Sequence, residues 1–271
     1  MKESIFLIIL LFSLAGSAEE AGIASYEDEM ALHLAGSYPV GEVVWLDAVE
    51  KPFLALYREA EGGHTGRAAI ILHSIGGHAD WPDTIAPVRT GLPAKGWSTL
   101  SIQLPVFAPH IPFAEYGSMF NIARARIQSS LKYLQGMQYS DIVLIGYSFG
   151  ASAAVNFLAG STTPVRAFAG ISMQKHAFLS PTYDLVDGLA GVKVPVLDIY
   201  GSQDFSDVVN SADDRRLAGS KSANPYEQII IPGANHYYNG MDGDLVDRIA
   251  EWLGTHIPSG KPLNPETFYS L

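Results

Sequence analysis

A serine enclosed by two glycines is the feature that most constrains what this chain can fold into. It stands in the run Gly146–Gly150, which reads GYSFG. Residues 142–145 before it are Ile, Val, Leu and Ile, the pattern of a buried strand, and small residues over 151–154 indicate a helix packed close to a sheet. A serine on a sharp strand-to-helix turn stands above its sheet with its hydroxyl available. We therefore expect Ser148 to be a nucleophile at the carboxyl end of a strand.

Strand-like and helix-like stretches alternate along the rest of the chain. The expected strands are 42–48 and 53–57 as an antiparallel pair, then 68–73, 97–103, 141–147, 166–173, 195–200 and 227–232. The expected helices are 82–92, 118–134, 150–158, 207–217 and 243–253. Such alternation predicts an α/β fold with a mostly parallel central sheet and helices on both faces. The loops that follow the strands should then surround one crevice.

A serine hydroxyl is a weak nucleophile at neutral pH and needs a base. His236 follows the last expected strand directly, which is where such a base would stand. His33 and His64 precede the core of the pattern, and His256 lies near the end of the final helix. His236 is therefore the candidate base.

An acid should orient the imidazole of that base and stabilise it when it is charged. Asp204 lies just past an expected strand and is the first choice. Asp207 is its rival three residues on, and Asp198 falls within the strand itself. The alternative for Asp204 is a helix cap or a solvated loop acid. With Asp204, the chain order is serine, acid, histidine, one of the known orders of such triads.

Two backbone amides should bind the oxyanion that forms when a serine attacks a carbonyl. The first is the N–H of Phe149, the residue after the nucleophile. The second should come from the loop 73–77, where Ile75 is the first choice and Ser74 the second. The alternative for this loop is a plain glycine turn.

Aromatic and histidine side chains are frequent in the loops expected around the crevice, where they could form an acyl pocket or pack beneath the loops. We select His73, Phe107, Tyr147 and Tyr237 as substrate-binding candidates, although His73 could instead brace its loop. Others in the same loops are His110, Ile111, Phe113, Tyr116, His176, Phe178 and Tyr238. We expect no metal, because His73, His78 and Asp80 form no ligand set of known spacing, and no nucleotide cofactor, because no phosphate-binding glycine motif occurs.

The first residues have the pattern of a signal peptide. Lys2 precedes an apolar run over 5–14, and the small residues 16–18 allow cleavage after Ala18. The alternative is an uncleaved membrane anchor. We expect a signal peptide at 1–18, an N-terminal extension at 19–40 and one α/β domain at 41–271. The protein should then be exported, to the periplasm or beyond the cell, with no stable membrane insertion after cleavage because no later apolar run is long enough.

Composition excludes some partners. The net charge of −11 disfavours a global attraction to nucleic acid or to anionic membranes. The absence of cysteine excludes disulfides, a zinc–thiolate site and a cysteine nucleophile. The oligomeric state is not indicated by the sequence.

From about residue 40 to its end, the chain resembles the α/β-hydrolase superfamily, and more narrowly an exported bacterial branch classed as a domain of unknown function. The resemblance rests on residues 71–82 (ILHSIGGHADWP), 91–93 (GLP), 96–101 (GWSTLS) and Gly146–Gly150. It implies the triad of Ser148, Asp204 and His236 without metal or organic cofactor. The stretch from 173 to 195 is too short for a large lid domain. In one departure, the loop that often reads His-Gly in the superfamily reads His-Ser here.

These features predict a serine hydrolase that forms an acyl-enzyme on a small-molecule substrate. Hydrolysis of an ester, as by a carboxylesterase, is the first hypothesis. The alternatives are an amidase or peptidase that uses the same triad, and a catalytically silent binding protein of the cell envelope.

Overall fold

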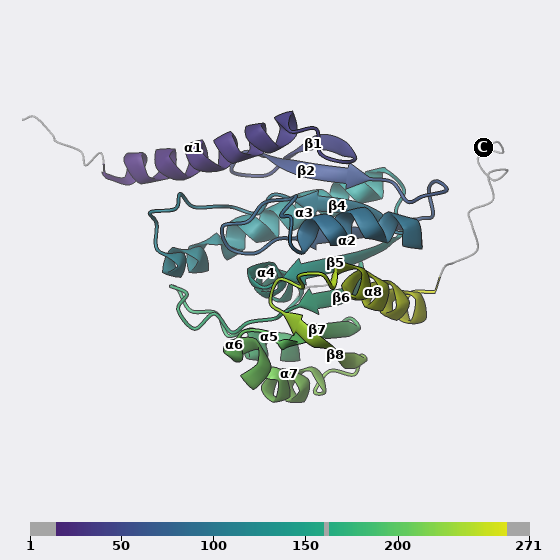
Figure 1. Cartoon of the computed structure of the whole chain (residues 1–271). Helices are drawn as coiled ribbons and strands as arrows, with labels where there is room; N and C mark the ends of the chain where they lie inside the picture. The colour runs from purple at the N-terminus through teal and green to yellow at the C-terminus, as the bar shows by residue number, and fades with distance from the viewer. Residues whose placement is uncertain (1–14, 160–162, 259–271) are drawn as a thin grey trace, which may run out of the picture.

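The computed structural model describes residues 15–159 and 163–258, and within them the side chains from residue 26 onward. Eight strands in this part of the chain form one sheet in the order β1-β2-β4-β3-β5-β6-β7-β8 (Figure 1). The strands are β1 (Glu42–Asp47), β2 (Pro52–Arg58), β3 (Arg67–Leu72), β4 (Ser98–Ile102), β5 (Asp141–Tyr147), β6 (Val165–Ile171), β7 (Val196–Gln203) and β8 (Tyr226–Asn235). β1–β2 and β2–β4 pair antiparallel, and all later pairs are parallel. This confirms the predicted mostly parallel sheet and its antiparallel first pair.

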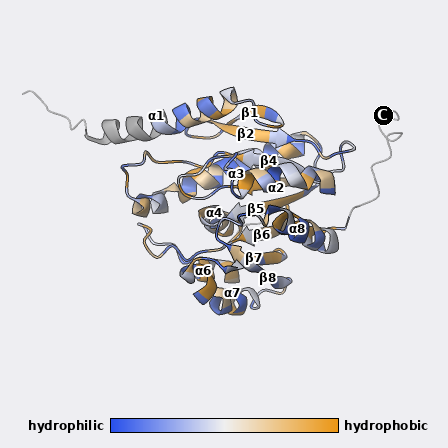
Figure 2. Cartoon of the chain, viewed as in Figure 1, coloured by the Kyte–Doolittle hydropathy of each residue, from blue (hydrophilic) through white to orange (hydrophobic). Residues whose placement is uncertain are grey.

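Helices cover both faces of the sheet, as predicted. α3 (Phe120–Gly136), α4 (Phe149–Leu158) and α5 (Leu185–Ala190) pack on one face. α2 (Ile85–Gly91) and α8 (Asp242–His256) pack on the other. Figure 2 shows hydrophilic and hydrophobic residues side by side on α2 and α3, as expected of helices with one buried face. The central strands are rich in Ile, Val, Leu and Ala because helices bury them on both faces.

The N-terminal extension predicted at 19–40 is mostly one helix. Helix α1 (Ala15–Gly36) lies along β2 at one end of the sheet (Figure 1). Its Ala31 and Leu34 form a small cluster with Leu54 and Leu56 of β2. Residues 1–14 lie outside the described residues, so the signal peptide stays a prediction. No helix of the described part is long and apolar enough to cross a membrane.

Three helical details differ from the sequence prediction. The single helix expected at 207–217 is two, α6 (Ser206–Asn210) and α7 (Ala212–Gly219). Short 3₁₀ helices, η1 (Leu92–Lys95) and η2 (Phe113–Met119), follow α2 and precede α3. Helix α5 was not expected, and the Asp184 side chain caps it by accepting from the amides of Val186 at 2.8 Å and Asp187 at 3.2 Å. An aspartate cap of this kind is a local sequence signal.

Candidate active site

Ser148 occupies a strained turn between β5 and α4. Its φ of 52° and ψ of −111° lie outside the regions that non-glycine residues favour. Its amide donates to the Ile171 carbonyl at 2.9 Å, and its own carbonyl accepts from Ala151 and Ser152 in the first turn of α4. Strain of this kind persists only where neighbouring structure holds the residue in place, and it is frequent at functional sites. The predicted strand–serine–helix turn is therefore present.

The two glycines of the turn are required by close packing. A Cβ at Gly146 would lie 2.6 Å from the Gly150 carbonyl oxygen, and one at Gly150 would lie 2.3 Å from that of Leu72. Both distances are far below any real Cβ contact, so no side chain fits. The absence of side chains lets α4 begin directly against the end of β3, beside the loop that follows it.

This packing gives a first prediction. We expect Gly150→Ala to destabilise the protein by about 1–3 kcal/mol or more, because the added carbon would push apart backbone that cannot yield locally. The matched control is Gly254→Ala in α8, where an added Cβ meets nothing within 4 Å. The control should raise stability by up to about 1 kcal/mol, since alanine favours a helix over glycine. Urea unfolding of both variants measures the change in the free energy of unfolding, which should have opposite signs. An unchanged free energy of unfolding in Gly150→Ala would contradict the close packing.

His236 and Asp204 are brought together beside Ser148. His236 Nδ1 lies 2.6 Å from Asp204 Oδ1, and both residues are buried. Asp207, the rival acid, is in the first turn of α6, and the carboxylate hydrogen-bonded to His236 is that of Asp204 instead. Asp198 lies in β7, where it pairs with the buried Arg215 at 2.8 Å. Of the three aspartates considered, Asp204, the first choice, is the one whose carboxylate is hydrogen-bonded to His236.

Asp204 accepts three hydrogen bonds. Besides His236, the Phe205 amide donates to Oδ1 at 2.7 Å, and the Ser172 hydroxyl donates to Oδ2 at 2.5 Å. Burial by itself would raise the pKa of Asp204, but these bonds and the nearby imidazole outweigh it and hold the pKa below its ordinary value. The carboxylate is therefore charged at neutral pH and can stabilise a protonated His236.

Aromatic rings fix the plane of the His236 imidazole. The Phe205 ring is stacked on it with centroids 4.0 Å apart, and the Tyr237 ring meets it edge-on at 5.5 Å. The Tyr147 hydroxyl donates to the His236 carbonyl at 3.2 Å. The histidine is thus restrained through its ring, its Nδ1 atom and its backbone.

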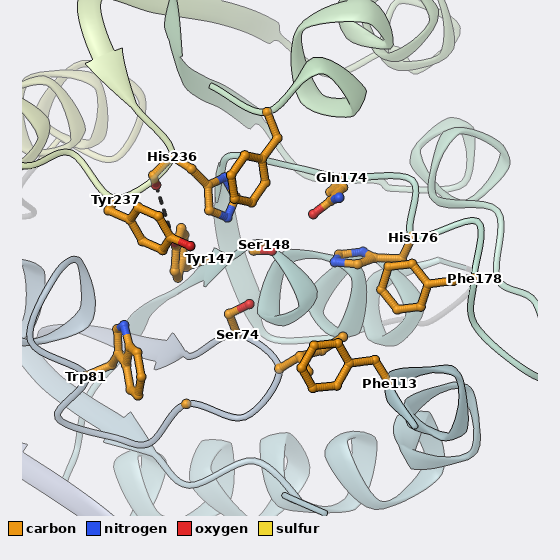
Figure 3. Close-up of a pocket in the computed structure, with 13 residues that line it drawn as sticks. Ser74, Trp81, Phe113, Tyr147, Ser148, Gln174, His176, Phe178, His236 and Tyr237 are labelled. Carbon is orange, nitrogen blue, oxygen red and sulfur yellow. Dashed lines mark hydrogen bonds between the residues drawn. The ribbon is translucent and has the colours of Figure 1, made fainter. Parts of the chain in front are cut away.

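Ser148 and His236 line the same cavity of about 340 Å³. Figure 3 shows the His236 ring pointing toward Ser148 across this space. Among the described residues, no hydrogen bond joins the Ser148 hydroxyl to His236. Such contacts are often long in unliganded enzymes and shorten when substrate binds. The other lining residues are Ser74, Ile75, Gly77, Trp81, Phe113, Tyr147, Gln174, His176, Phe178, Phe205 and Tyr237.

The amides at the two predicted oxyanion positions belong to Ile75, which lines this cavity, and to Phe149, which follows the lining residue Ser148. Neither the Phe149 N–H nor the Ile75 N–H has a hydrogen-bond partner among the described residues. The Ser74 carbonyl accepts from the Gly77 amide at 3.1 Å and from His73 Nδ1 at 2.7 Å, which fixes the turn. A fixed turn holds the Ile75 amide in place without using its hydrogen, as an oxyanion site requires.

Two of the four substrate-binding candidates do not line the cavity. Tyr147 and Tyr237 line the cavity, but His73 and Phe107 do not. His73 is buried beneath its loop, where Nε2 accepts from the Leu104 amide at 2.8 Å, and burial lowers its pKa to about 3. The Phe107 ring packs edge-on against Tyr116 in the core. His73 therefore braces the loop, which was the alternative for it.

Several residues of the site were not predicted in their roles. Ser172 was placed inside a strand, but it follows β6 and has a φ of 51°, which turns its hydroxyl toward Asp204. Tyr238 is fully buried behind it, with the two hydroxyl oxygens 3.0 Å apart. The sequence pattern gave no signal for Ser172, because the expected strand continued to residue 173. No group of three or more His, Asp or Glu side chains in the described part is arranged to hold a metal.

A known protein family matches most of the length of the chain. Residues 15–119 and 115–255 match the model of the family described as "Protein of unknown function (DUF3530)". The chain belongs to this family. A search of curated proteins finds no match to this DUF3530 member.

Solved structures show that this DUF3530 member has the α/β-hydrolase fold. Est1E from Butyrivibrio proteoclasticus with ferulic acid bound has a TM-score of 0.64 at 16% identity, over 79% of this chain and 99% of that one. Dienelactone hydrolase from Anabaena variabilis has 0.63 at 19%, over 80% and 98%. XC6422 from Xanthomonas campestris, a serine hydrolase without a lid, has 0.64 at 15%, over 82% and 98%. At these identities the likeness establishes the fold, as the sequence predicted.

Proposed function

We propose that this protein hydrolyses carboxylic esters of small molecules through a triad of Ser148, His236 and Asp204. The observation that carries the proposal is the 2.6 Å contact between His236 Nδ1 and the charged Asp204, in the same cavity as a strained serine. The two unpartnered amides of Phe149 and Ile75 supply the remaining requirement, an oxyanion site.

In the first half-reaction, Ser148 Oγ attacks the ester carbonyl carbon while His236 Nε2 takes its proton. The carbonyl π electrons move to the oxygen, which the Phe149 and Ile75 amides then bind. When the tetrahedral intermediate collapses, the bond to the alcohol oxygen breaks and His236 gives its proton to that oxygen. The products are an acyl-serine and a free alcohol. The N-terminus of α4 adds positive potential beside the oxyanion.

In the second half-reaction, water takes the place of the alcohol. His236 removes a proton from the water, whose oxygen attacks the acyl carbon. The bond to Ser148 Oγ then breaks, and His236 returns the proton to the serine. Asp204 stays ionised throughout and stabilises the imidazolium each time it forms. The cycle consumes one ester and one water and needs no added group.

The substrate class is supported by the lining of the cavity. Aromatic side chains dominate it, and its volume of about 340 Å³ is that of a small-molecule site. The fold neighbours include proteins named as an esterase and a dienelactone hydrolase. Both observations favour a small ester with an apolar part, which was the first hypothesis from the sequence.

Covalent labelling tests the proposal. We expect a fluorophosphonate probe to add one phosphonyl group to the protein, located at Ser148 by peptide mass spectrometry, and a short-chain p-nitrophenyl ester to be turned over. Ser148→Ala should do neither while it keeps the native circular dichroism spectrum. Turnover of a p-nitroanilide in preference to the ester would favour the amidase alternative. A folded native protein that neither labels nor hydrolyses would indicate a binding protein instead.

We also propose that the protein is exported. The basis is the sequence of residues 1–18 alone, with a lysine, an apolar run and small residues before the expected cleavage. N-terminal sequencing of the protein purified from its native cell envelope checks this. A first residue of Glu19 is expected, and an intact Met1 would contradict cleavage.

A further inference from the structure

The cavity contains a second histidine that the proposed mechanism does not use. His176 lines it and is only 3% exposed. Its Nδ1 lies 3.3 Å from the Ser152 hydroxyl, which also lies 3.5 Å from the Gln174 carbonyl. The Phe149 and Phe178 rings meet the imidazole edge-on. The ring is therefore held in place, while its Nε2 atom has no hydrogen-bond partner among the described residues.

His176 lies on the opposite side of Ser148 from His236. Figure 3 shows the two imidazoles pointing toward the serine from opposite sides. In the proposed reaction the alcohol must lie near His236, because His236 protonates it. The acyl group extends to the other side, where His176, Gln174, Phe113 and Phe178 line the cavity. This half of the cavity is the acyl side.

The chemistry of His176 is that of a neutral hydrogen-bond acceptor. Burial lowers its pKa to about 4, so the ring is uncharged at neutral pH. The Ser152 hydroxyl donates to the Gln174 carbonyl at 3.5 Å and can therefore accept from Nδ1 at 3.3 Å, which favours the proton on Nδ1. Nε2 then presents a lone pair to the cavity. A lone pair attracts a hydroxyl and repels a carboxylate, and the neighbouring phenyl rings favour a flat apolar group.

We propose that this half of the cavity is an acyl subsite in which His176 Nε2 accepts a hydrogen bond from a hydroxyl carried by an aromatic acyl group. This inference rests on the proposed ester hydrolysis and adds its acyl specificity. A site built to bond a substrate hydroxyl discriminates strongly against the analogue that lacks it, because a buried polar group is then left unpaired.

A matched pair of esters tests the subsite, namely methyl 3-(4-hydroxyphenyl)propanoate and methyl 3-phenylpropanoate, with the 3-hydroxyphenyl isomer as a second hydroxylated ester. Two methylene groups insulate the ester from the ring, so the hydroxyl does not alter its intrinsic reactivity. For the native protein we expect kcat/KM to be about tenfold or more higher for one of the hydroxylated esters. His176→Phe should reduce this ratio to within about twofold, since phenylalanine keeps the ring and loses the acceptor. The control is His110→Phe, at an exposed histidine outside the cavity, which should keep the native ratio.

A binding measurement separates failure of the subsite from failure of the proposed reaction. Calorimetry with Ser148→Ala, which keeps His176, should show the same preference for the hydroxylated ester without turnover. Equal binding of hydroxylated and unhydroxylated esters would overturn the subsite, as would a native ratio that His176→Phe leaves unaltered. If the native protein neither labels nor hydrolyses any ester, the proposed reaction fails, and the binding preference still decides the subsite.

Discussion

Asp204→Ala should lower kcat/KM for ester hydrolysis by about 10⁴-fold, as removal of the acid does in other serine triads. The carboxylate does two things that alanine cannot. It accepts a hydrogen bond from His236 Nδ1, with the nitrogen 2.6 Å from Oδ1, so that Nε2 is free to take the serine proton. Its negative charge also stabilises the imidazolium. Steady-state kinetics with a p-nitrophenyl ester measures the loss.

Asp207→Ala is the matched control for this prediction. Asp207 was the rival acid in the sequence and lies three residues away in the first turn of α6, but the acid hydrogen-bonded to His236 is Asp204. We expect its kinetics to match those of the native protein. Circular dichroism of both variants excludes unfolding as the cause. An equal loss in the two variants, or a native rate in Asp204→Ala, would remove Asp204 from the mechanism.

Asp204→Asn separates the two contributions of the carboxylate. The Phe205 amide donates to Oδ1 at 2.7 Å, so the introduced amide should place its oxygen there and its NH₂ toward the Ser172 hydroxyl. That orientation keeps the Nδ1 proton on His236 and removes only the charge. We therefore expect a smaller loss of kcat/KM than for Asp204→Ala. A loss of kcat/KM as large as that of Asp204→Ala would mean that the introduced amide has the flipped orientation. Its NH₂ group would then face His236 Nδ1 and impose the wrong tautomer on the imidazole.

The centre of the site could be predicted from the sequence because its signals are local. The turn at Ser148 is encoded within about a dozen residues by a hydrophobic run, two glycines and a small-residue helix. His236 and Asp204 follow strands whose order along the chain fixes which loops meet. Parallel strands place these loops at one edge, so chain position predicts proximity. The structure indeed brings the three residues together.

The lining of the cavity could not be predicted in the same way. Loop composition shows which residues are near a crevice, but the direction of each side chain depends on tertiary contacts. Phe107 is directed into the core because its amide is bonded to the buried Tyr116 hydroxyl at 3.1 Å. His176 is held at the cavity by its contact with Ser152, whose hydroxyl also donates to the Gln174 carbonyl. Nothing in the local sequence distinguishes these two loop residues.

Helix α1 shows a further limit of the sequence pattern. The segment 19–40 was expected to be an extension outside the domain, yet Glu27 of this helix is 2% exposed. Its carboxylate lies 2.8 Å from Nη1 of the buried Arg126 in α3, and it accepts from the Val106 amide at 3.2 Å. Its partners are far away in the chain, so no local pattern reveals that the residue is buried.

Glu27→Ala should therefore destabilise the protein by about 3 kcal/mol, the lower end of the cost of breaking a buried ion pair. The lower end applies because Arg126 keeps Glu50 at 2.8 Å and the Gln103 carbonyl at 3.0 Å. For a chain of this size, the midpoint of thermal unfolding should fall by roughly 6–12 °C. Differential scanning fluorimetry or urea unfolding measures the change.

The neighbouring Asp28→Ala separates burial from charge. Asp28 also pairs with a cation, Lys51 at 2.7 Å, but its side chain is 50% exposed. An exposed pair contributes at most about 1 kcal/mol, so this variant should stay close to the native stability. The two variants remove one carboxylate each from adjacent positions of the same helix. A large loss for Glu27 alone would show that the buried charge holds α1 to α3 and the Val106 loop, and equal small losses would show that this charge contributes little to the stability.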